Sequence, residues 1–316
     1  MDQASTLAQS LHATDGKAAY DRACKQLLSE KSILAWIMQT CLEEYRNCDV
    51  KEVEKYIEGM PQVGEEAVFP NESSPLIQGA DTTDKSLAEG TVTYDIRFFA
   101  VTPAEGEQVR IIINLEMQNK FDPGYPLLKR AIYYCSRMLS SQHGREFTHS
   151  HYEKIKKVYS IFICMGSSKQ RENTITRYRM TEENLVGALQ EPIHHYDLLS
   201  VVLLCLGDSE KEAPNKLLKL LNTLLSNETG ESEKRRVLEE DFDIPMTHRL
   251  ESEVSTMCNL SQGVEEKGIQ KGRKDERLLL LKKLLKNGKM SMEEILVAWE
   301  IPEADWPKYR QLLAEQ

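Results

Sequence analysis

The sequence lacks the features that mark several classes of protein. Its longest apolar candidate, 198–206, is far shorter than the roughly 18 apolar residues that cross a membrane. The first residues have neither the basic start nor the apolar stretch of a signal peptide. No CxxC pair occurs among the seven cysteines, which argues against a zinc ribbon. Several cysteines lie inside apolar runs as small hydrophobic residues, so we expect a cytoplasmic location and no membrane partner.

An excess of positive charge is also missing. The formal net charge of the 316 residues is −10, which argues against a protein that coats nucleic acid non-specifically. A local basic surface on an acidic molecule can still bind phosphates, so a nuclease is not excluded. Hydrophobic residues at 41% and charged residues at 28% are ordinary for a globular protein. The length allows one large domain or two smaller ones.

The spacing of apolar residues predicts an α/β protein, with a mixed central sheet flanked by helices. Helical periodicity and strand-like runs alternate along the first two thirds of the chain, and the remainder is helical. The expected elements are a helix over 21–45, an irregular segment 61–90 with a short strand near Leu76, strands 91–101 and 109–117 joined as a hairpin, a helix over 126–141, strands 158–165 and 198–206, and helices from 213 onward.

We expect three parts: a core over 15–210, a helical extension over 211–262 and a charged helical tail over 263–316. In the tail, Ser291 and Glu294 have the spacing of a capping box and predict a short helix. Acidic residues are interleaved with the bases between Lys267 and Lys289. This pattern favours a surface helix or a self-associating one over a DNA-binding arm, so a homo-oligomer through the C-terminal helices is expected.

The most informative segment is Ile111–Gln118, a strand-like run interrupted by polar residues. Strand side chains alternate between faces, so Glu116 and Gln118 point to the same side. The hairpin would bring Asp95 close to this pair. Two acids with a polar partner at a sheet edge suggest a Mg²⁺ site for attack on a phosphodiester, with the Met117 carbonyl as a further oxygen. The structural alternative is a solvated polar edge on an ordinary sheet.

The following helix offers partners for these acids. Arg130, Tyr134 and Arg137 fall three to four residues apart, opposite the apolar stripe. That face could direct Arg130 and Tyr134 at a phosphate or at the acidic pair. The structural alternative is a half-buried polar helix face, with Tyr134 packed against the sheet.

The order of these motifs resembles the PD-(D/E)XK nuclease family transposases, the recombination-promoting nuclease relatives. The resemblance is carried by Tyr94–Arg97, Asn114–Gln118 and Lys129–Tyr134, with a glycine-spaced tail at Val264–Gly272. It covers roughly residues 20–210 and this tail, and the order D…ExQ…R…Y is fairly specific as a set.

The resemblance implies a restriction-endonuclease-like core that cuts DNA with Mg²⁺, for which Mn²⁺ is a possible substitute. Asp95 and Glu116 would be the metal ligands, and Arg130 and Tyr134 would complete the catalytic set. Gln118 would occupy the position that a lysine usually holds in the wider superfamily. Glutamine is usual at this position in the transposase branch of that superfamily. A further acid on the first helix is sometimes used, and Glu30 is the nearest candidate.

Two other groups of residues carry weaker signals. Neighbouring histidines, His149 with His151 and His194 with His195, lack a spaced cysteine or acid, so we do not expect zinc. Basic clusters at 154–157 and 169–179 are typical of a solvated surface, although beside the strand 158–165 they could line a DNA groove.

The sequence therefore predicts a Mg²⁺-dependent DNA endonuclease linked to mobile elements or recombination. The rival hypothesis is a catalytically inactive protein that keeps the fold and binds nucleic acid or itself. Nuclease activity on RNA is a third alternative.

Overall fold

The computed structural model describes residues 18–63, 83–86, 90–103, 110–118, 121–209 and 211–260, and in the C-terminal part residues 280–281, 283–285, 291–299, 303, 306–307 and 309. Contacts divide the chain into two compact units, Tyr20–Cys258 and a unit formed by Met1–Ala19 with Asn259–Gln316. The expected boundaries at 210/211 and 262/263 stay predictions.

The larger unit is built on a six-stranded mixed sheet in the order β1-β4-β5-β6-β8-β7. Strands β5, β6 and β8 run parallel, while β1, β4 and β7 pair antiparallel with their neighbours. A separate hairpin is formed by β2 and β3. The strands are β1 (Ile57–Val63), β2 (Thr83–Ser86), β3 (Gly90–Thr93), β4 (Ile96–Val101), β5 (Arg110–Gln118), β6 (Val158–Cys164), β7 (Thr174–Arg179) and β8 (Leu199–Cys205).

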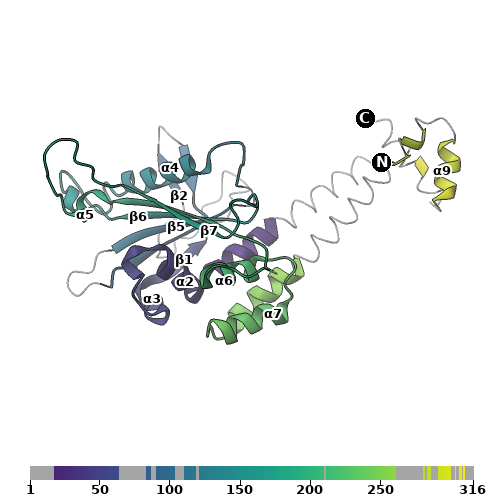
Figure 1. The fold of residues 1–316 in the computed structure, drawn as a ribbon, viewed down its shortest axis with the longest axis horizontal. Helices are drawn as coiled ribbons and strands as arrows, with labels where there is room; N and C mark the ends of the chain where they lie inside the picture. The colour runs from purple at the N-terminus through teal and green to yellow at the C-terminus, as the bar shows by residue number, and fades with distance from the viewer. Residues whose placement is uncertain are drawn as a thin grey trace. The chain divides into compact units, whose positions relative to one another are not determined.

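Helices cover both faces of the sheet, which confirms the predicted α/β class (Figure 1). Helix α4 lies on one face, and α2, α3 and α6 lie on the other. The helical elements of this unit are a helix over 18–28, α2 (Lys31–Cys41), η1 (Glu43–Tyr45), α3 (Val50–Tyr56), α4 (Leu127–Ser140), η2 (Tyr152–Lys154), α5 (Ile193–Tyr196), α6 (Lys216–Leu225), α7 (Glu231–Arg236), the π-helical turn η3 (Val237–Asp241) and a helix from residue 248 onward.

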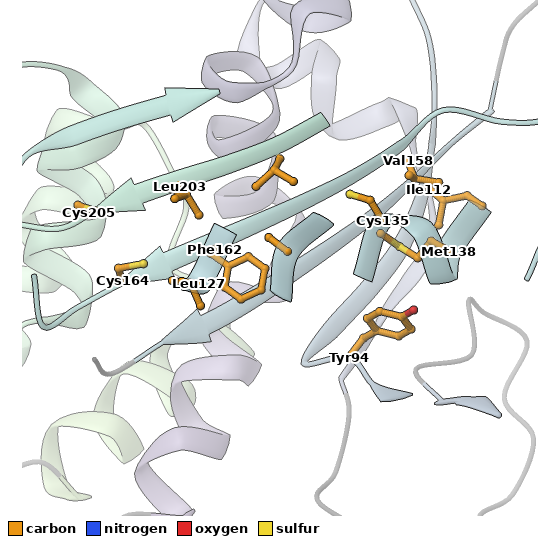
Figure 2. Packing of buried hydrophobic residues seen from close by; sticks show 12 residues of the cluster. Tyr94, Ile112, Leu127, Cys135, Met138, Val158, Phe162, Cys164, Leu203 and Cys205 are labelled. Carbon is orange, nitrogen blue, oxygen red and sulfur yellow. The ribbon is translucent and has the colours of Figure 1, made fainter. Parts of the chain in front are cut away.

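Helix α4 is held on the sheet by its apolar stripe. Leu127, Ala131, Cys135 and Met138 recur at helical spacing, and all four are buried. Figure 2 shows α4 side chains packed with Phe162 and other residues of the sheet. Because α4 connects β5 to the parallel strand β6, this packing fixes the polar face of α4 near the end of β5.

Strands β6 and β8 form the middle of the core. Every residue of β6 is buried, and so is every residue of β8 after Leu199. A strand covered by helices on both faces excludes water from both sets of side chains, which accounts for the continuous apolar runs in the sequence. The strands predicted over 158–165 and 198–206 are thus confirmed as neighbouring parallel strands.

The hairpin predicted from the two runs around Asp95 and Glu116 is present in part. Strands β4 and β5 pair antiparallel, with Ile96 opposite Leu115. The expected strand over 91–101 is wrong as one element, because Tyr94 and Asp95 separate β3 from β4. The break has a physical cause, since the backbone N–H of Asp95 donates to the Glu116 side chain.

Other expectations differ from the structure or lie outside the residues that it describes. The helix expected over 21–45 is interrupted at Ser29, whose hydroxyl donates to the Gln26 carbonyl and helps to end the first helix. Strands β1 and β7 lie at the edges of the sheet and were not predicted, and neither was β2, which lies in the segment expected to be irregular. The short strand expected near Leu76 and the tail segment Val264–Gly272 lie outside the described residues.

The described part of the second unit contains α9 (Met292–Ala298). The Ser291 side chain accepts from the backbone N–H of Glu294, and the Glu294 carboxylate accepts from the backbone N–H of Ser291. The predicted capping box is therefore confirmed. Across the described residues of the whole chain, no helix has the length and apolar character needed to span a membrane.

Candidate active site

Asp95 and Glu116 are joined by two hydrogen bonds at the start of β4 and near the end of β5. The backbone N–H of Asp95 donates to Glu116 Oε1 at 3.1 Å. In return, the backbone N–H of Met117 donates to Asp95 Oδ2 at 2.9 Å. The Glu116 carboxylate thus binds the backbone of Asp95, and the Asp95 carboxylate binds the backbone of β5. The antiparallel register of β4 and β5 therefore brings the two predicted acids together.

The polar face of α4 contacts this acidic pair through Arg130. Its Nη2 lies 3.3 Å from Glu116 Oε2, and its Nη1 donates to Gln118 Oε1 at 3.3 Å. Arg130 also donates to the hydroxyls of Tyr134, at 2.9 Å, and Tyr125, at 3.1 Å. Glu116 and Gln118 lie on the same face of β5, as strand alternation predicts. The structure thus gathers Asp95, Glu116, Gln118, Arg130 and Tyr134 in one cluster.

A cation that the sequence analysis did not identify completes the cluster. Lys25, on the helix over 18–28, places Nζ 2.9 Å from Asp95 Oδ1 and 2.6 Å from Asp21 Oδ2. Only 7% of Lys25 is exposed. Burial by itself lowers the pKa of Lys25, but the charges and hydrogen bonds of Asp95 and Asp21 outweigh it and raise that pKa. Lys25 is therefore a fixed positive charge on the candidate site.

Glu116 is the more deeply buried of the two acids, with 2% of the residue exposed. Burial and the nearby charge of Asp95 raise its pKa from 4.5 to about 8. Hydrogen bonds from Asp95 and Asn114 and the charge of Arg130 act in the opposite direction. A carboxyl group with so perturbed a pKa, beside a second acid, is typical of a functional site.

Tyr134 links the cluster to the core. Its ring packs edge-on against Tyr94 with centroids 5.4 Å apart, and it lies 6.2 Å from the Phe162 ring. The guanidinium of Arg130 lies 5.0 Å from the centroid of the Tyr134 ring. Burial raises the pKa of Tyr134, and the charge of Glu116 acts in the same direction. The hydroxyl therefore stays protonated near neutral pH, and the ring and hydroxyl together orient Arg130.

The donor set fits a divalent cation that prefers oxygen ligands. Asp95, just before β4, and Glu116, on β5, offer carboxylate oxygens, and their mutual repulsion in a buried setting would be relieved by added positive charge. Each of the four carboxylate oxygens already accepts at least one protein donor, so an added cation would share these oxygens with those donors. Among the residues that the structure describes, no cluster of three or more His, Cys, Asp or Glu side chains forms a metal site. The fit thus rests on the two carboxylates and on backbone or water oxygens.

Glu30 and Arg137, which the sequence also suggested, contact other residues. Glu30, the suggested acid of the first helix, pairs with Arg249 at 2.7 Å, and the acid that contacts this cluster through Lys25 is Asp21. Arg137 is buried and donates to the Tyr133 hydroxyl.

The basic clusters are largely ion-paired. Lys157 lies 2.6 Å from Asp197, and Lys156 pairs with Glu146. Arg177 and Arg179 lie on β7 and share Glu43, at 3.1 and 2.8 Å. These pairs favour a structural role for the basic residues, and β7 borders β8 rather than the strand 158–165.

His194 and His195, on the short helix α5, pack edge-on with ring centroids 4.4 Å apart, and His195 also pairs with Glu191, which precedes the helix. His151 pairs with Glu153 at 3.0 Å.

Four residues that contact the cluster were not identified from the sequence: Lys25, Asp21, Asn114 and Tyr125. Asp21 and Lys25 have i,i+4 spacing, which by itself indicates only a pair on a helix surface. Asn114 is fully buried, points to the same face as Glu116 and donates to Ser160 at 3.3 Å. An asparagine inside an apolar strand two residues before Glu116 is the one signal in the sequence that could have identified it.

The mixed six-stranded sheet with flanking helices is consistent with the restriction-endonuclease-like fold of PD-(D/E)XK nucleases. Residues 81–258 match the family model of the PD-(D/E)XK nuclease family transposases. This segment is more than half of the chain, which therefore belongs to that family, as the resemblance predicted. No match was found among curated proteins or among solved structures.

Proposed function

We propose that this protein hydrolyses DNA phosphodiester bonds with Mg²⁺, in the biology of mobile elements or recombination. The observation that carries the proposal is the pair of Asp95 and Glu116, linked by two backbone hydrogen bonds and contacted by Arg130. Membership of a nuclease family supports the reaction type. The raised pKa of Glu116 supports a site built to receive positive charge.

Asp95 and Glu116 would hold the ion, and Mn²⁺ is a possible substitute. Such an ion polarises the phosphate and lowers the pKa of the attacking water. The protein keeps both carboxylates in place through backbone N–H groups, so that neither has to reorganise when substrate arrives.

Arg130 and Gln118 would act on the substrate and on water. Arg130 points its guanidinium at the cluster from α4, and its side chain is 28% exposed, so a phosphate can reach it. Gln118 has an amide that can orient a water molecule, but it does not titrate and cannot serve as a base. Tyr134 fixes Arg130 by a hydrogen bond of 2.9 Å. Tyr134 is thus proposed as a positioning residue.

A plasmid-nicking assay tests the proposal. Purified protein should convert supercoiled DNA to nicked circles with Mg²⁺ or Mn²⁺, and chelation should stop the reaction. Asp95→Ala and Glu116→Ala should each abolish nicking, because each removes a proposed metal ligand. Glu153→Ala is a matched control, since Glu153 is an exposed acid outside the cluster. Nicking that survives both site variants would overturn the assignment.

The rival hypothesis is supported by a specific observation. Every carboxylate oxygen of the pair already accepts a protein donor, as expected of a purely structural cluster. A protein that binds a labelled duplex but cuts neither DNA nor RNA with either metal would favour the inactive interaction protein. Cleavage of RNA alone would favour the third alternative.

We also propose self-association through the C-terminal helices and a cytoplasmic location. The charged and leucine-containing sequence of the tail supports the first, and the seven free thiols support the second. Sedimentation of the full chain and of a variant lacking 263–316 tests the tail. If the full chain and the deletion variant form particles with the same number of chains, self-association through the tail is contradicted.

A further inference from the structure

The candidate site contains a cation whose role the proposed function leaves open. Lys25 comes from the first described helix, far along the chain from β4 and β5. It lies between two carboxylates, 2.9 Å from Asp95 Oδ1 and 2.6 Å from Asp21 Oδ2. A lysine that is 7% exposed is unusual unless it is paired, and here both of its partners are acids.

Lys25 contacts Asp95 at an oxygen that a bound metal ion would also use. Asp95 Oδ2 accepts the backbone N–H of Met117, whereas Oδ1 has no backbone donor among the described residues. Lys25 contacts that oxygen. An ammonium group and a divalent ion that seek the same carboxylate oxygen compete for it, because their positive charges repel each other at close range.

Asp21 gives Lys25 a second anchor. If an ion took Asp95 Oδ1, the Asp21 carboxylate would keep the ammonium group beside the site instead of releasing it to solvent. Substrate phosphate would then meet two protein cations, Lys25 from the first helix and Arg130 from α4. Gln118 on β5 is neutral and supplies no charge of its own.

We propose that Lys25 is a further functional residue of this site, which neutralises Asp95 in the metal-free protein and serves as a ligand to the substrate phosphate once the ion is bound. The phosphate half of this inference rests on the proposed nuclease function. The half that concerns metal competition does not, because it is measured by binding alone.

The variant Lys25→Met separates the two halves. It removes the charge but keeps a side chain of similar length. In isothermal titration of the full chain with Mn²⁺, the variant should bind on the order of tenfold more tightly than the original protein, because a competing charge is gone. In the nicking assay, the same variant should lose on the order of a hundredfold in rate, because a phosphate ligand is gone.

Two further variants keep the proposal testable if Lys25→Met folds poorly. Lys25→Arg retains the charge, so it should keep Mn²⁺ affinity close to the original and restore most of the nicking rate. Lys31→Met is the matched control, since Lys31 is a partly buried lysine that donates to the Ile57 carbonyl at 3.0 Å. It should change neither quantity. Circular dichroism of every variant reports the folded state.

Each result supports or overturns a stated part of the proposal. Weaker Mn²⁺ binding together with slower nicking in Lys25→Met would show that Lys25 only supports Asp95 structurally, and would overturn the proposal. Nicking at the original rate would overturn the phosphate role. If the unmodified protein cuts no substrate, the proposed function and the phosphate role fail together. Tighter Mn²⁺ binding by Lys25→Met would then still establish the competition at Asp95.

Discussion

Asp95 and Glu116 are bonded in both directions beside the β4–β5 pair: the Glu116 carboxylate accepts the backbone N–H of Asp95, and the Asp95 carboxylate accepts that of Met117 on β5. This reciprocity means that neither acid can move without breaking a hydrogen bond of its partner. The separation of the two carboxylates is thus set by strand register rather than by flexible side chains. A site held in this way is preorganised for a ligand that bridges both groups.

The first prediction concerns stability and pH in the absence of metal. Folding raises the pKa of Glu116 from 4.5 to about 8 through burial and the charge of Asp95. Between these values the folded protein keeps a proton that the unfolded chain releases. The free energy of unfolding should therefore fall as pH rises through this window, by at most about 1.4 kcal/mol per pH unit, and should level off above it.

Glu116→Gln should remove this dependence, because glutamine resembles the protonated acid at every pH. Urea unfolding across the pH series provides the measurement. Glu153→Gln, at an exposed position, should keep the original slope. An equal slope in Glu116→Gln and in the unmodified protein would contradict the buried proton.

The second prediction concerns metal affinity and pH. A carboxylate must be deprotonated to bind a cation, so Mn²⁺ has to displace the proton from Glu116. Affinity should therefore rise by up to about tenfold per pH unit below about pH 8 and become constant above it. Titration in buffers of different ionisation enthalpy should report proton release on binding below that pH. Affinity that does not change with pH would rule out Glu116 as the titrating ligand.

The third prediction separates two neighbouring tyrosines on α4. Tyr134 accepts a hydrogen bond from Arg130, whereas Tyr133 is 43% exposed and accepts from Arg137. Tyr134→Phe should lower the nicking rate by roughly tenfold, because Arg130 loses one of its anchors. Tyr133→Phe should leave the rate unchanged. A comparable loss in both variants would indicate a general effect on α4.

The fourth prediction concerns Arg130 itself. Arg130→Lys keeps the charge but loses the planar fork that reaches Glu116 and Gln118 together. The rate of nicking should fall in Arg130→Lys and fall further in Arg130→Ala, while both variants remain folded by circular dichroism. Equal rates in the two variants would mean that charge at this position has no part in the reaction.

The fifth prediction addresses the packing that carries the site. Phe162 is fully buried between α4 and the sheet (Figure 2). Phe162→Ala should reduce the free energy of unfolding by about 3–5 kcal/mol, because it opens a cavity under the helix that presents Arg130. Leu185→Ala is the control, since Leu185 is 86% exposed. Denaturant unfolding measures both, and a small loss for Phe162→Ala would place the core elsewhere.

The sequence was informative where local rules decide the geometry. Alternation along β5 put Glu116 and Gln118 on one face, and the hairpin brought Asp95 to them. Helical spacing placed Arg130 and Tyr134 on the same side of α4. These relationships need only the period of each element and the order of neighbouring ones.

Relationships that depend on packing between distant elements could not be predicted. Nothing in the sequence around Lys25 indicates that its helix docks beside Asp95, because an acid four residues before a lysine is common on exposed helices. Strand β7 was missed because its side chains are mostly exposed and polar, without an apolar face. Strand β1 was missed because Gly59 and Pro61 disfavour a regular strand.

The two edge strands that were not predicted also limit how the sheet can grow. β1 and β7 are its outer strands, each with one side unpaired within the sheet, and unpaired strands attract other chains. β1 carries Pro61, which has no N–H to donate, and a register shift between Glu58 and Gln62. β7 carries the charged side chains Arg177 and Arg179, and charged residues on an edge strand disfavour pairing with an added strand. The features that made β1 and β7 hard to predict from the sequence thus protect the folded protein from edge-to-edge aggregation.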